Sequence, residues 1–336
     1  MRSLISQILF LLASYVAAAP QGTAPVGDGK QKGDGGLSSF LEGLGLPKMS
    51  GFVYPPEYLK SEGTGKFPAH FYSEPTLPKH TIFAPKNLPA GTKTPILVWG
   101  EGACMNNGLE KGPLLLQLAS QGVTILANGV LPADKQPPAF ATMTSTGQTL
   151  KENMMAQAID WAEKQKSTEK WAHLDTSRIA AAGQSCGGLE TLVMATDKRV
   201  KSLGIFNSGS AIASGGVSTA FLPLPNNGSV PDGSKINVPT FFFLGGAMDV
   251  ATAKNHKDYE AMPEGVPAWA ADYKTGGHGG TYNELNAGSY GVLGSHWLKY
   301  VLLGDKESAE FFKQDKATGE GWLNLKKKNL EKIAVV

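Results

Sequence analysis

The chain has 336 residues, of which 41% are hydrophobic and 18% are charged, and its formal net charge is +2. This length and apolar content are sufficient for a large buried core, in one large domain or two smaller ones. A charge this small argues against nucleic acid or an acidic protein as the partner.

The first 50 residues have a composition that separates them from the rest. Residues 1–19 have the pattern of a secretory signal, with Arg2 before a mainly apolar run and Ala17-Ala18-Ala19 at its end. The run is too short for a good transmembrane helix, and a buried N-terminal helix is the alternative. Residues 20–50 are rich in Gly, Lys and Asp and predict a flexible leader. We therefore expect a secreted, extracellular protein without a stable membrane anchor, folded over residues 51–336.

If the protein is exported, its cysteines and its glycosylation sequon can be interpreted. Cys104 and Cys186 are the only cysteines, and an oxidising environment favours a disulfide between them; two unpaired buried thiols are the alternative. Asn227-Gly228-Ser229 is the only N-glycosylation sequon and lies in a polar loop, so Asn227 is the predicted acceptor.

From about Phe67 onward, short apolar runs alternate with amphipathic segments. Residues 95–99 are continuously apolar, which is typical of a buried parallel strand, whereas residues 150–164 carry apolar side chains on one face of a helix. The alternation predicts an α/β fold, with a mostly parallel central sheet and helices on both faces. Lys326-Lys327-Lys328 is expected on a solvated helix face. Strands are predicted at residues 70–72, 80–83, 95–99, 123–127, 178–182, 200–206, 238–244 and 266–273, and helices at 108–120, 150–164, 189–195, 282–303 and 307–312.

The sequence Gly183-Gln184-Ser185-Cys186-Gly187 joins one of these strands to the following helix. In a G-x-S-x-G turn of this kind, the strained serine presents its hydroxyl outward, and the glycines leave room for neighbouring backbone. The helix that follows directs its unpaired N–H groups toward a developing negative charge. The alternative is a glycine-rich turn without a chemical role.

Two later motifs follow later strands: Gly246-Ala247-Met248-Asp249 and Gly277-His278-Gly279-Gly280. In parallel sheets, ligands bind beyond the carboxyl ends of the strands, where Ser185, Asp249 and His278 all fall. With these three motifs in this order, the chain from about Phe67 to Lys313 resembles the α/β-hydrolase superfamily. It is most similar to secreted fungal members related to the dienelactone-hydrolase, chlorophyllase and polyester-hydrolase (cutinase-like) branches.

The chemistry assigns a role to each residue of this triad. Ser185 would attack an acyl carbon, His278 would accept its proton as general base, and Asp249 would orient and stabilise the imidazole. A locally bonded loop histidine and a helix N-cap are the alternatives for His278 and Asp249. Asp232 and Glu264 are rival carboxylates, but both lie within loops.

An oxyanion hole requires two N–H donors. One is expected from Cys186, directly after the nucleophile, and the second from Glu101 or Gly102 in the loop after residue 99. The Glu101 side chain is expected to be solvated, with a substrate-facing carboxylate as the alternative. Since Cys104 and Cys186 lie in these two segments, a disulfide between them would brace the hole.

These expectations define a secreted serine esterase that acts on a small or polymeric ester as a monomer. Segments 209–236 and 131–146 are expected to wall the acyl pocket; for 209–236 the alternative is a solvent-exposed loop with one buried apolar anchor. The remaining histidines lack metal-binding spacing, so no metal or other cofactor is expected. A secreted serine peptidase and a non-catalytic binding module on the same fold are the alternatives.

Overall fold

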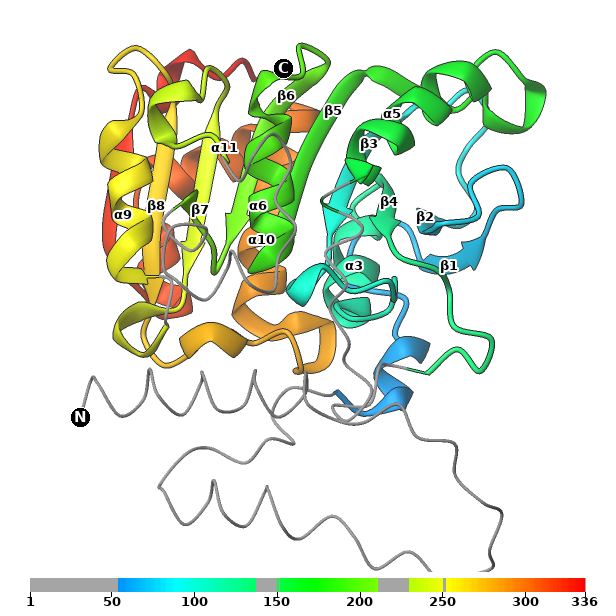
Figure 1. Ribbon diagram of the computed structural model, residues 1–336, viewed down its shortest axis with the longest axis horizontal. Coiled ribbons are helices and arrows are strands. Elements are labelled where there is room, and N and C mark those ends of the chain that lie inside the picture. Colours follow the sequence, from blue (N-terminus) through cyan, green and yellow to red (C-terminus); the bar gives the residue numbers. More distant parts are fainter. Residues whose placement is uncertain (1–53, 137–149, 151, 211–229, 250–251, 336) are drawn as a thin grey trace, which may run out of the picture. The chain divides into compact units, whose positions relative to one another are not determined.

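A nine-stranded sheet organises the part of the chain that the computed structural model describes, residues 54–136, 150, 152–210, 230–249 and 252–335 (Figure 1). All of these residues belong to one compact unit, Ser50–Val336. The expected signal and leader, the sequon at Asn227, and residues 137–146 and 211–229 of the expected pocket walls lie outside the described residues. Within the described residues, no helix combines the length and apolarity needed to cross a membrane.

The strand order is β1-β2-β4-β3-β5-β6-β7-β8-β9. The six strands from β4 to β8 in this order are parallel, and β1, β2 and β9 run antiparallel to their neighbours at the two edges. The strands are β1 (Ala69–Ser73), β2 (His80–Pro85), β3 (Thr94–Gly100), β4 (Thr124–Asn128), β5 (Leu174–Gln184), β6 (Val200–Phe206), β7 (Thr240–Leu244), β8 (Ala268–Tyr273) and β9 (Trp322–Lys328).

Alternating side chains of the central strands build a core on each face of the sheet. In β3, Leu97 and Trp99 belong to the core shared with α3, α10 and α11, whereas Ile96 and Val98 belong to the core shared with α5, α6 and α9. Helices therefore cover both faces, as predicted (Figure 1). The helices are α3 (Gly112–Ala119), α5 (Met154–Gln165), α6 (Cys186–Val193), α9 (Thr252–Ala261), α10 (Gly288–Leu303) and α11 (Lys306–Lys313).

The α/β class and all eight predicted strands are confirmed, but the ninth strand was not predicted. The expectation of a helix around Lys326-Lys327-Lys328 is wrong, because these lysines lie on β9, which pairs with β8 at the edge of the sheet. Lysine is common on edge strands because it discourages pairing with another chain. The buried Trp322 anchors the start of this strand.

The order of the strands determines where a site can form. The chain passes from β3 to β4 on one side and returns to β5 on the other, so that β3 lies between β4 and β5. Such a switch in direction separates the loops that follow β3 and β5, and ligands of open α/β sheets bind there. The Gly100–Cys104 loop lies at the end of β3, and the turn at Ser185 follows β5.

Candidate active site

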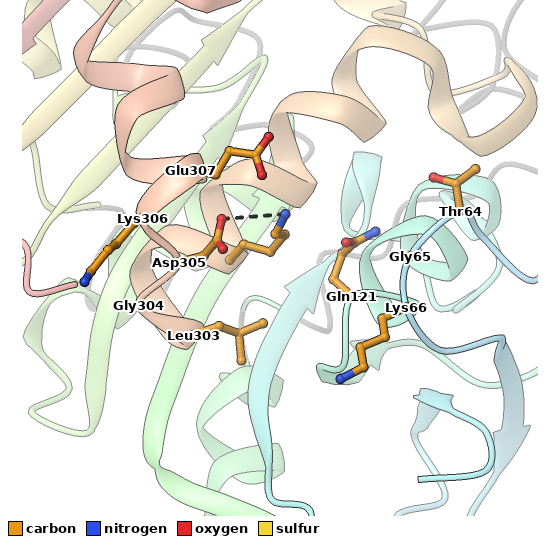
Figure 2. A pocket seen from close by; sticks show the side chains of 10 residues that line it. Thr64, Gly65, Lys66, Gln121, Leu303, Gly304, Asp305, Lys306 and Glu307 are labelled. Atoms are coloured by element: carbon orange, nitrogen blue, oxygen red, sulfur yellow. Dashed lines mark ion pairs between the residues drawn. The ribbon is translucent and has the colours of Figure 1, made fainter. Parts of the chain in front are cut away.

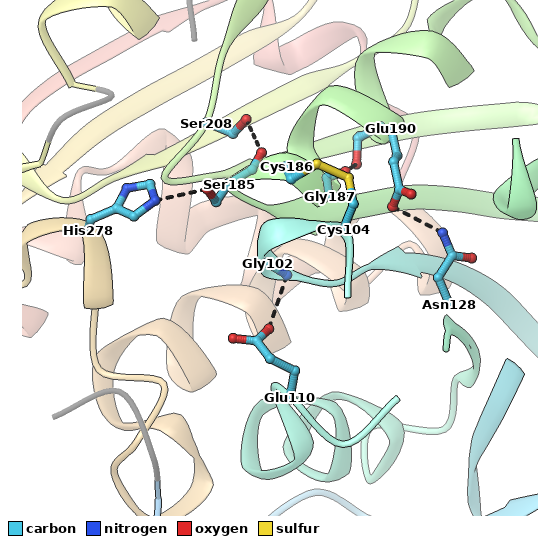
Figure 3. Close-up of a disulfide and its surroundings, with 11 residues drawn as sticks. Gly102, Cys104, Glu110, Asn128, Ser185, Cys186, Gly187, Glu190, Ser208 and His278 are labelled. Atoms are coloured by element: carbon cyan, nitrogen blue, oxygen red, sulfur yellow. Dashed lines mark hydrogen bonds between the residues drawn. A yellow bond between two sulfur atoms is a disulfide. The ribbon is translucent and has the colours of Figure 1, made fainter. Parts of the chain in front are cut away.

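Ser185 lies at the turn between β5 and α6 in a conformation that non-glycine residues rarely adopt, with φ 55° and ψ −114°. Strain of this kind costs about 1–3 kcal/mol and persists only where the surroundings hold it. The Ser185 N–H donates to Phe206 O at 3.0 Å, and Ser185 O accepts from the Ser208 hydroxyl at 2.6 Å (Figure 3). The neighbouring strand β6 and the loop after it therefore hold the turn in place.

The two glycines of the motif allow α6 to approach the sheet closely. A Cβ atom on Gly187 would lie 1.9 Å from Gly100 O, and one on Gly183 would lie 2.3 Å from Gly187 O. Any larger residue at either position would force β3, β5 and α6 apart. The G-x-S-x-G spacing thus has a packing cause as well as a conformational one.

The structure brings together the three side chains that the sequence predicted as a triad. His278 Nε2 lies 2.9 Å from Ser185 Oγ, and His278 Nδ1 lies 2.7 Å from Asp249 Oδ1. The Asp249 carboxylate is fully buried, whereas 27% of the His278 side chain is exposed. In Figure 3 the His278 ring points at the Ser185 hydroxyl. The imidazole is therefore held through Nδ1 by a buried carboxylate, while part of the His278 side chain remains open to solvent.

Asp249 is held by donors that the sequence analysis did not identify. Its Oδ2 atom accepts the Asn207 side-chain amide at 2.9 Å and the Gly245 N–H at 3.0 Å. Asn207 Oδ1 in turn accepts the Tyr282 hydroxyl at 2.5 Å. Burial raises the pKa of Tyr282 well above its usual value, so this hydroxyl remains a donor. Asn207 directly follows β6, at the carboxyl ends of the strands where the triad also lies. This position was the only indication in the sequence that Asn207 belongs to the site.

The predicted disulfide between Cys104 and Cys186 is present, with the two Cα atoms 5.2 Å apart. Cys186 is the first residue of α6, so its N–H is among the N-terminal donors that have no acceptor within the helix. The disulfide joins this residue to the loop after β3 (Figure 3). The two segments expected to supply oxyanion donors are thus covalently linked.

The loop after β3 differs from the expectation in the placement of its acidic residue. The Glu101 side chain is neither solvated nor substrate-facing: it is completely buried, and its Oε2 accepts the Trp99 indole N–H at 3.0 Å. Burial, followed by the charge of Glu110, raises the pKa of Glu101 well above its usual value. The Gly102 N–H donates to Glu110 Oε2 at 3.1 Å and so is engaged within the protein.

A hollow of about 730 Å³ lies elsewhere, between the segment before β1, the end of α3 and the junction of α10 and α11 (Figure 2). Helices that follow parallel strands return to the amino ends of those strands. The hollow therefore lies at the amino ends of the strands, whereas the triad lies at their carboxyl ends. Its charges are partly compensated, since Lys299 Nζ lies 3.6 Å from Asp305 Oδ1. It contains none of the residues that the sequence singled out for chemistry.

The fold and the site define an α/β protein that carries an aligned Ser–His–Asp arrangement at the carboxyl ends of its parallel strands. Neither a family model nor a curated protein matches the chain. The described residues contain no group of three or more His, Cys, Asp and Glu side chains arranged to hold a metal ion.

Proposed function

We propose that this protein is an exported serine hydrolase of the α/β-hydrolase type that cleaves carboxylic esters through an acyl-enzyme. The observation that carries the proposal is the continuous hydrogen-bonded line from Asp249 through His278 to the strained Ser185. Each neighbour in this line lies within the distance that proton transfer requires.

In the first step, Ser185 Oγ attacks the ester carbonyl carbon while His278 Nε2 accepts the hydroxyl proton. The imidazolium that forms is stabilised by the buried Asp249 carboxylate, which also fixes the tautomer of His278. His278 then donates the proton to the departing alkoxide, which leaves an acyl group on Ser185. In the second step, water adds to the acyl carbon while His278 accepts one of its protons. His278 then returns this proton to Ser185 Oγ as the bond to the acyl carbon breaks, which releases the carboxylic acid and regenerates free Ser185.

The negative charge on the carbonyl oxygen needs donors throughout both steps. The Cys186 N–H at the start of α6 is well placed by its position directly after Ser185. Because the Gly102 N–H is engaged with Glu110, we assign the second donor to the N–H of Glu101. This assignment chooses between the two donors that the sequence left open.

An apolar side chain beside the triad favours an ester with a hydrocarbon portion. Met248 directly precedes Asp249 and is 80% exposed, and a Cβ on Gly277 would lie 3.6 Å from its Cβ. The Met248 Cβ therefore lies near the turn that carries His278, and the exposed remainder of the side chain can contact an acyl or alkyl chain. The disulfide supports export, since such bonds persist in oxidising compartments.

The test is hydrolysis of p-nitrophenyl esters of increasing acyl length, beside matched peptide amides, by the wild type, Ser185→Ala and Ser177→Ala. Ser177 lies on the same strand β5, and its N–H and hydroxyl both donate to Asp175 two residues away, so its variant controls for the loss of a serine. We expect ester turnover that falls by about 10⁴-fold or more in Ser185→Ala alone. Cleavage of the peptide amides as well as the esters would identify a peptidase, and turnover of neither would favour a binding module.

A further inference from the structure

Glu110, two residues before α3, lies on the inner side of the loop that follows β3. It is 5% exposed, and its Oε2 accepts the Gly102 N–H at 3.1 Å (Figure 3). A Cβ on Gly102 would lie 3.3 Å from both Glu110 carboxylate oxygens, so the carboxylate is in close contact with this part of the loop. The triad chemistry described above gives Glu110 no role.

The charge of Glu110 is matched within the protein. Lys111 Nζ contacts Glu110 Oε1 and lies 5.0 Å from the ring centroid of Tyr282, the residue whose hydroxyl donates to Asn207. Lys111 is itself 8% exposed, so this ion pair is largely removed from water. A buried pair of this kind persists where further hydrogen bonds satisfy it, and the Gly102 N–H is one of them.

Glu101 completes the arrangement from the other side of the loop. Its pKa is raised by burial and by the nearby charge of Glu110, and a raised pKa favours the neutral form of Glu101. Tyr54, which also faces both glutamates, stays neutral because burial raises its pKa.

We propose that Glu110 is a positioning residue for the oxyanion hole of this hydrolase, acting through the Gly102 N–H. By accepting this N–H, the Glu110 carboxylate holds the peptide plane between Glu101 and Gly102, and so limits the rotation about the Glu101 backbone that would turn the Glu101 N–H, which lies in the preceding peptide plane, away from the site. The Cys104–Cys186 disulfide holds the far end of the same loop. This inference rests on the proposed function, since it names what aligns the second donor of the proposed site.

Three variants and a matched control test the proposal. Glu110→Leu removes the acceptor, Glu110→Gln keeps an acceptor oxygen without the charge, and Glu110→Asp withdraws the carboxylate by one methylene. Glu74 provides the control, because it is equally buried, accepts the Thr76 N–H at 3.1 Å and pairs with Lys170 at 2.6 Å, but lies in the loop after β1. For each variant, kcat and KM on a p-nitrophenyl ester are measured beside the Ki of an alkyl trifluoromethyl ketone, whose tetrahedral adduct on Ser185 places an oxyanion in the hole.

Loss of one oxyanion donor costs about 10²–10³-fold in kcat, and misalignment costs less. We therefore expect Glu110→Leu and Glu110→Asp to lower kcat about tenfold to 100-fold, with KM within about twofold and the ketone Ki raised in parallel. Glu110→Gln should retain kcat within about threefold, and Glu74→Leu should lose thermal stability without changing kcat or Ki. If Glu110→Leu does not fold, Glu110→Asp decides.

Two results would overturn the positioning role in an active enzyme. One is a kcat within about threefold of wild type in both Glu110→Leu and Glu110→Asp. The other is a loss of kcat with an unchanged ketone Ki, which would indicate a structural role only. A wild-type protein that neither hydrolyses esters nor forms the ketone adduct would instead overturn the proposed function, and this inference with it.

Discussion

Asp249 and His278 come from the ends of two different strands and meet Ser185 through hydrogen bonds alone, whereas the loop after β3 is joined to α6 by the covalent Cys104–Cys186 bond. The first group, the triad side, depends on a fully buried carboxylate. The second, the oxyanion side, depends on a disulfide and on the carboxylate of Glu110. Changes to the triad side should therefore act on chemistry, and changes to the oxyanion side should also act on stability.

The groups around the buried carboxylate of each side explain this difference in expected effects. On the triad side, the Asp249 carboxylate accepts hydrogen bonds from the Asn207 amide and the Gly245 N–H, both neutral, and lies beside the imidazole that would become an imidazolium in the proposed reaction. On the oxyanion side, Glu110 carries a lysine partner in the resting protein. In the proposed mechanism, the positive charge opposite Asp249 therefore forms only during the reaction, whereas Glu110 already has a lysine partner in the resting protein.

The largest expected effect is that of Asp249→Asn. Because the Asn207 amide and the Gly245 N–H both point at Oδ2, the new amide must place its oxygen there and its NH₂ toward His278 Nδ1. That orientation favours the wrong imidazole tautomer, and kcat should fall by about 10⁴-fold. Asp232→Asn, at an aspartate that caps a short helical turn, should keep full activity. Steady-state kinetics of both variants measure this difference. A similar loss of kcat in the two variants would contradict the account.

The next effect belongs to the oxyanion side. The disulfide closes a sequence separation of 82 residues, and removing it should lower the free energy of unfolding by about 4 kcal/mol. Urea denaturation with and without a reductant measures this change in the wild type. The Cys104→Ala/Cys186→Ala double variant should be less stable and indifferent to the reductant. Two free thiols in the purified protein, found by mass spectrometry, would refute the disulfide.

A stability effect outside both sides sharpens the comparison. His80 lies on β2, which β4 separates from β3, and its buried Nε2–H donates to Met154 O at 3.0 Å. Burial lowers the pKa of His80 to about 4, against 6.5 for a free histidine. Between these values the unfolded chain binds more protons than the native one, so stability falls as pH drops from about 6.5 to about 4, by up to about 3 kcal/mol.

Replacing this histidine should remove its share of the pH dependence. In His80→Gln, the free energy of unfolding should fall less steeply than in the wild type over the same pH window, while kcat at neutral pH stays unchanged. Urea denaturation of both proteins from pH 7.5 to 4 gives the difference. Parallel curves would show that His80 does not titrate as described.

The smallest expected effect tests the support of the triad. Asn207→Ala removes one of the two N–H groups on Asp249 Oδ2, and hydrogen bonds to charged groups contribute about 1.5–3 kcal/mol, so kcat should fall about tenfold to 100-fold. Asn324 is a close match: it also has a positive φ and its amide donates to a carboxylate, that of Asp272, at 2.8 Å. Equal losses of kcat in Asn207→Ala and Asn324→Ala would mean that backbone strain, not support of Asp249, is responsible.

The sequence predicted those features whose signals are local. The strand–turn–helix pattern around Ser185 and the positions of Asp249 and His278 after later strands were sufficient to predict their convergence. The alternation of strands and helices predicted a mostly parallel sheet, but it did not fix the order of the strands within that sheet. The edge strand β9 was missed because its lysines hide the apolar alternation, and only pairing with β8 makes it a strand.

The supporting residues could not be predicted, because their roles depend on partners distant in the sequence. Asn207 contacts Asp249 and Tyr282 across 42 and 75 residues. Glu101 was expected in solvent because a charged loop residue is usually exposed, yet the fold of the loop buries it beside Trp99 and Glu110. A single sequence does not reveal that two glutamates nine positions apart share one buried site.

The central claim is that Ser185 is an activated nucleophile, and covalent labelling tests it most directly. The full chain is treated with a fluorophosphonate, digested and mapped by mass spectrometry, beside His278→Ala as a folded variant that lacks the base. The account predicts stoichiometric labelling of the wild type on Ser185 and very slow labelling of His278→Ala. Absence of a Ser185 adduct in the folded wild type, or equal labelling of both proteins, would contradict it.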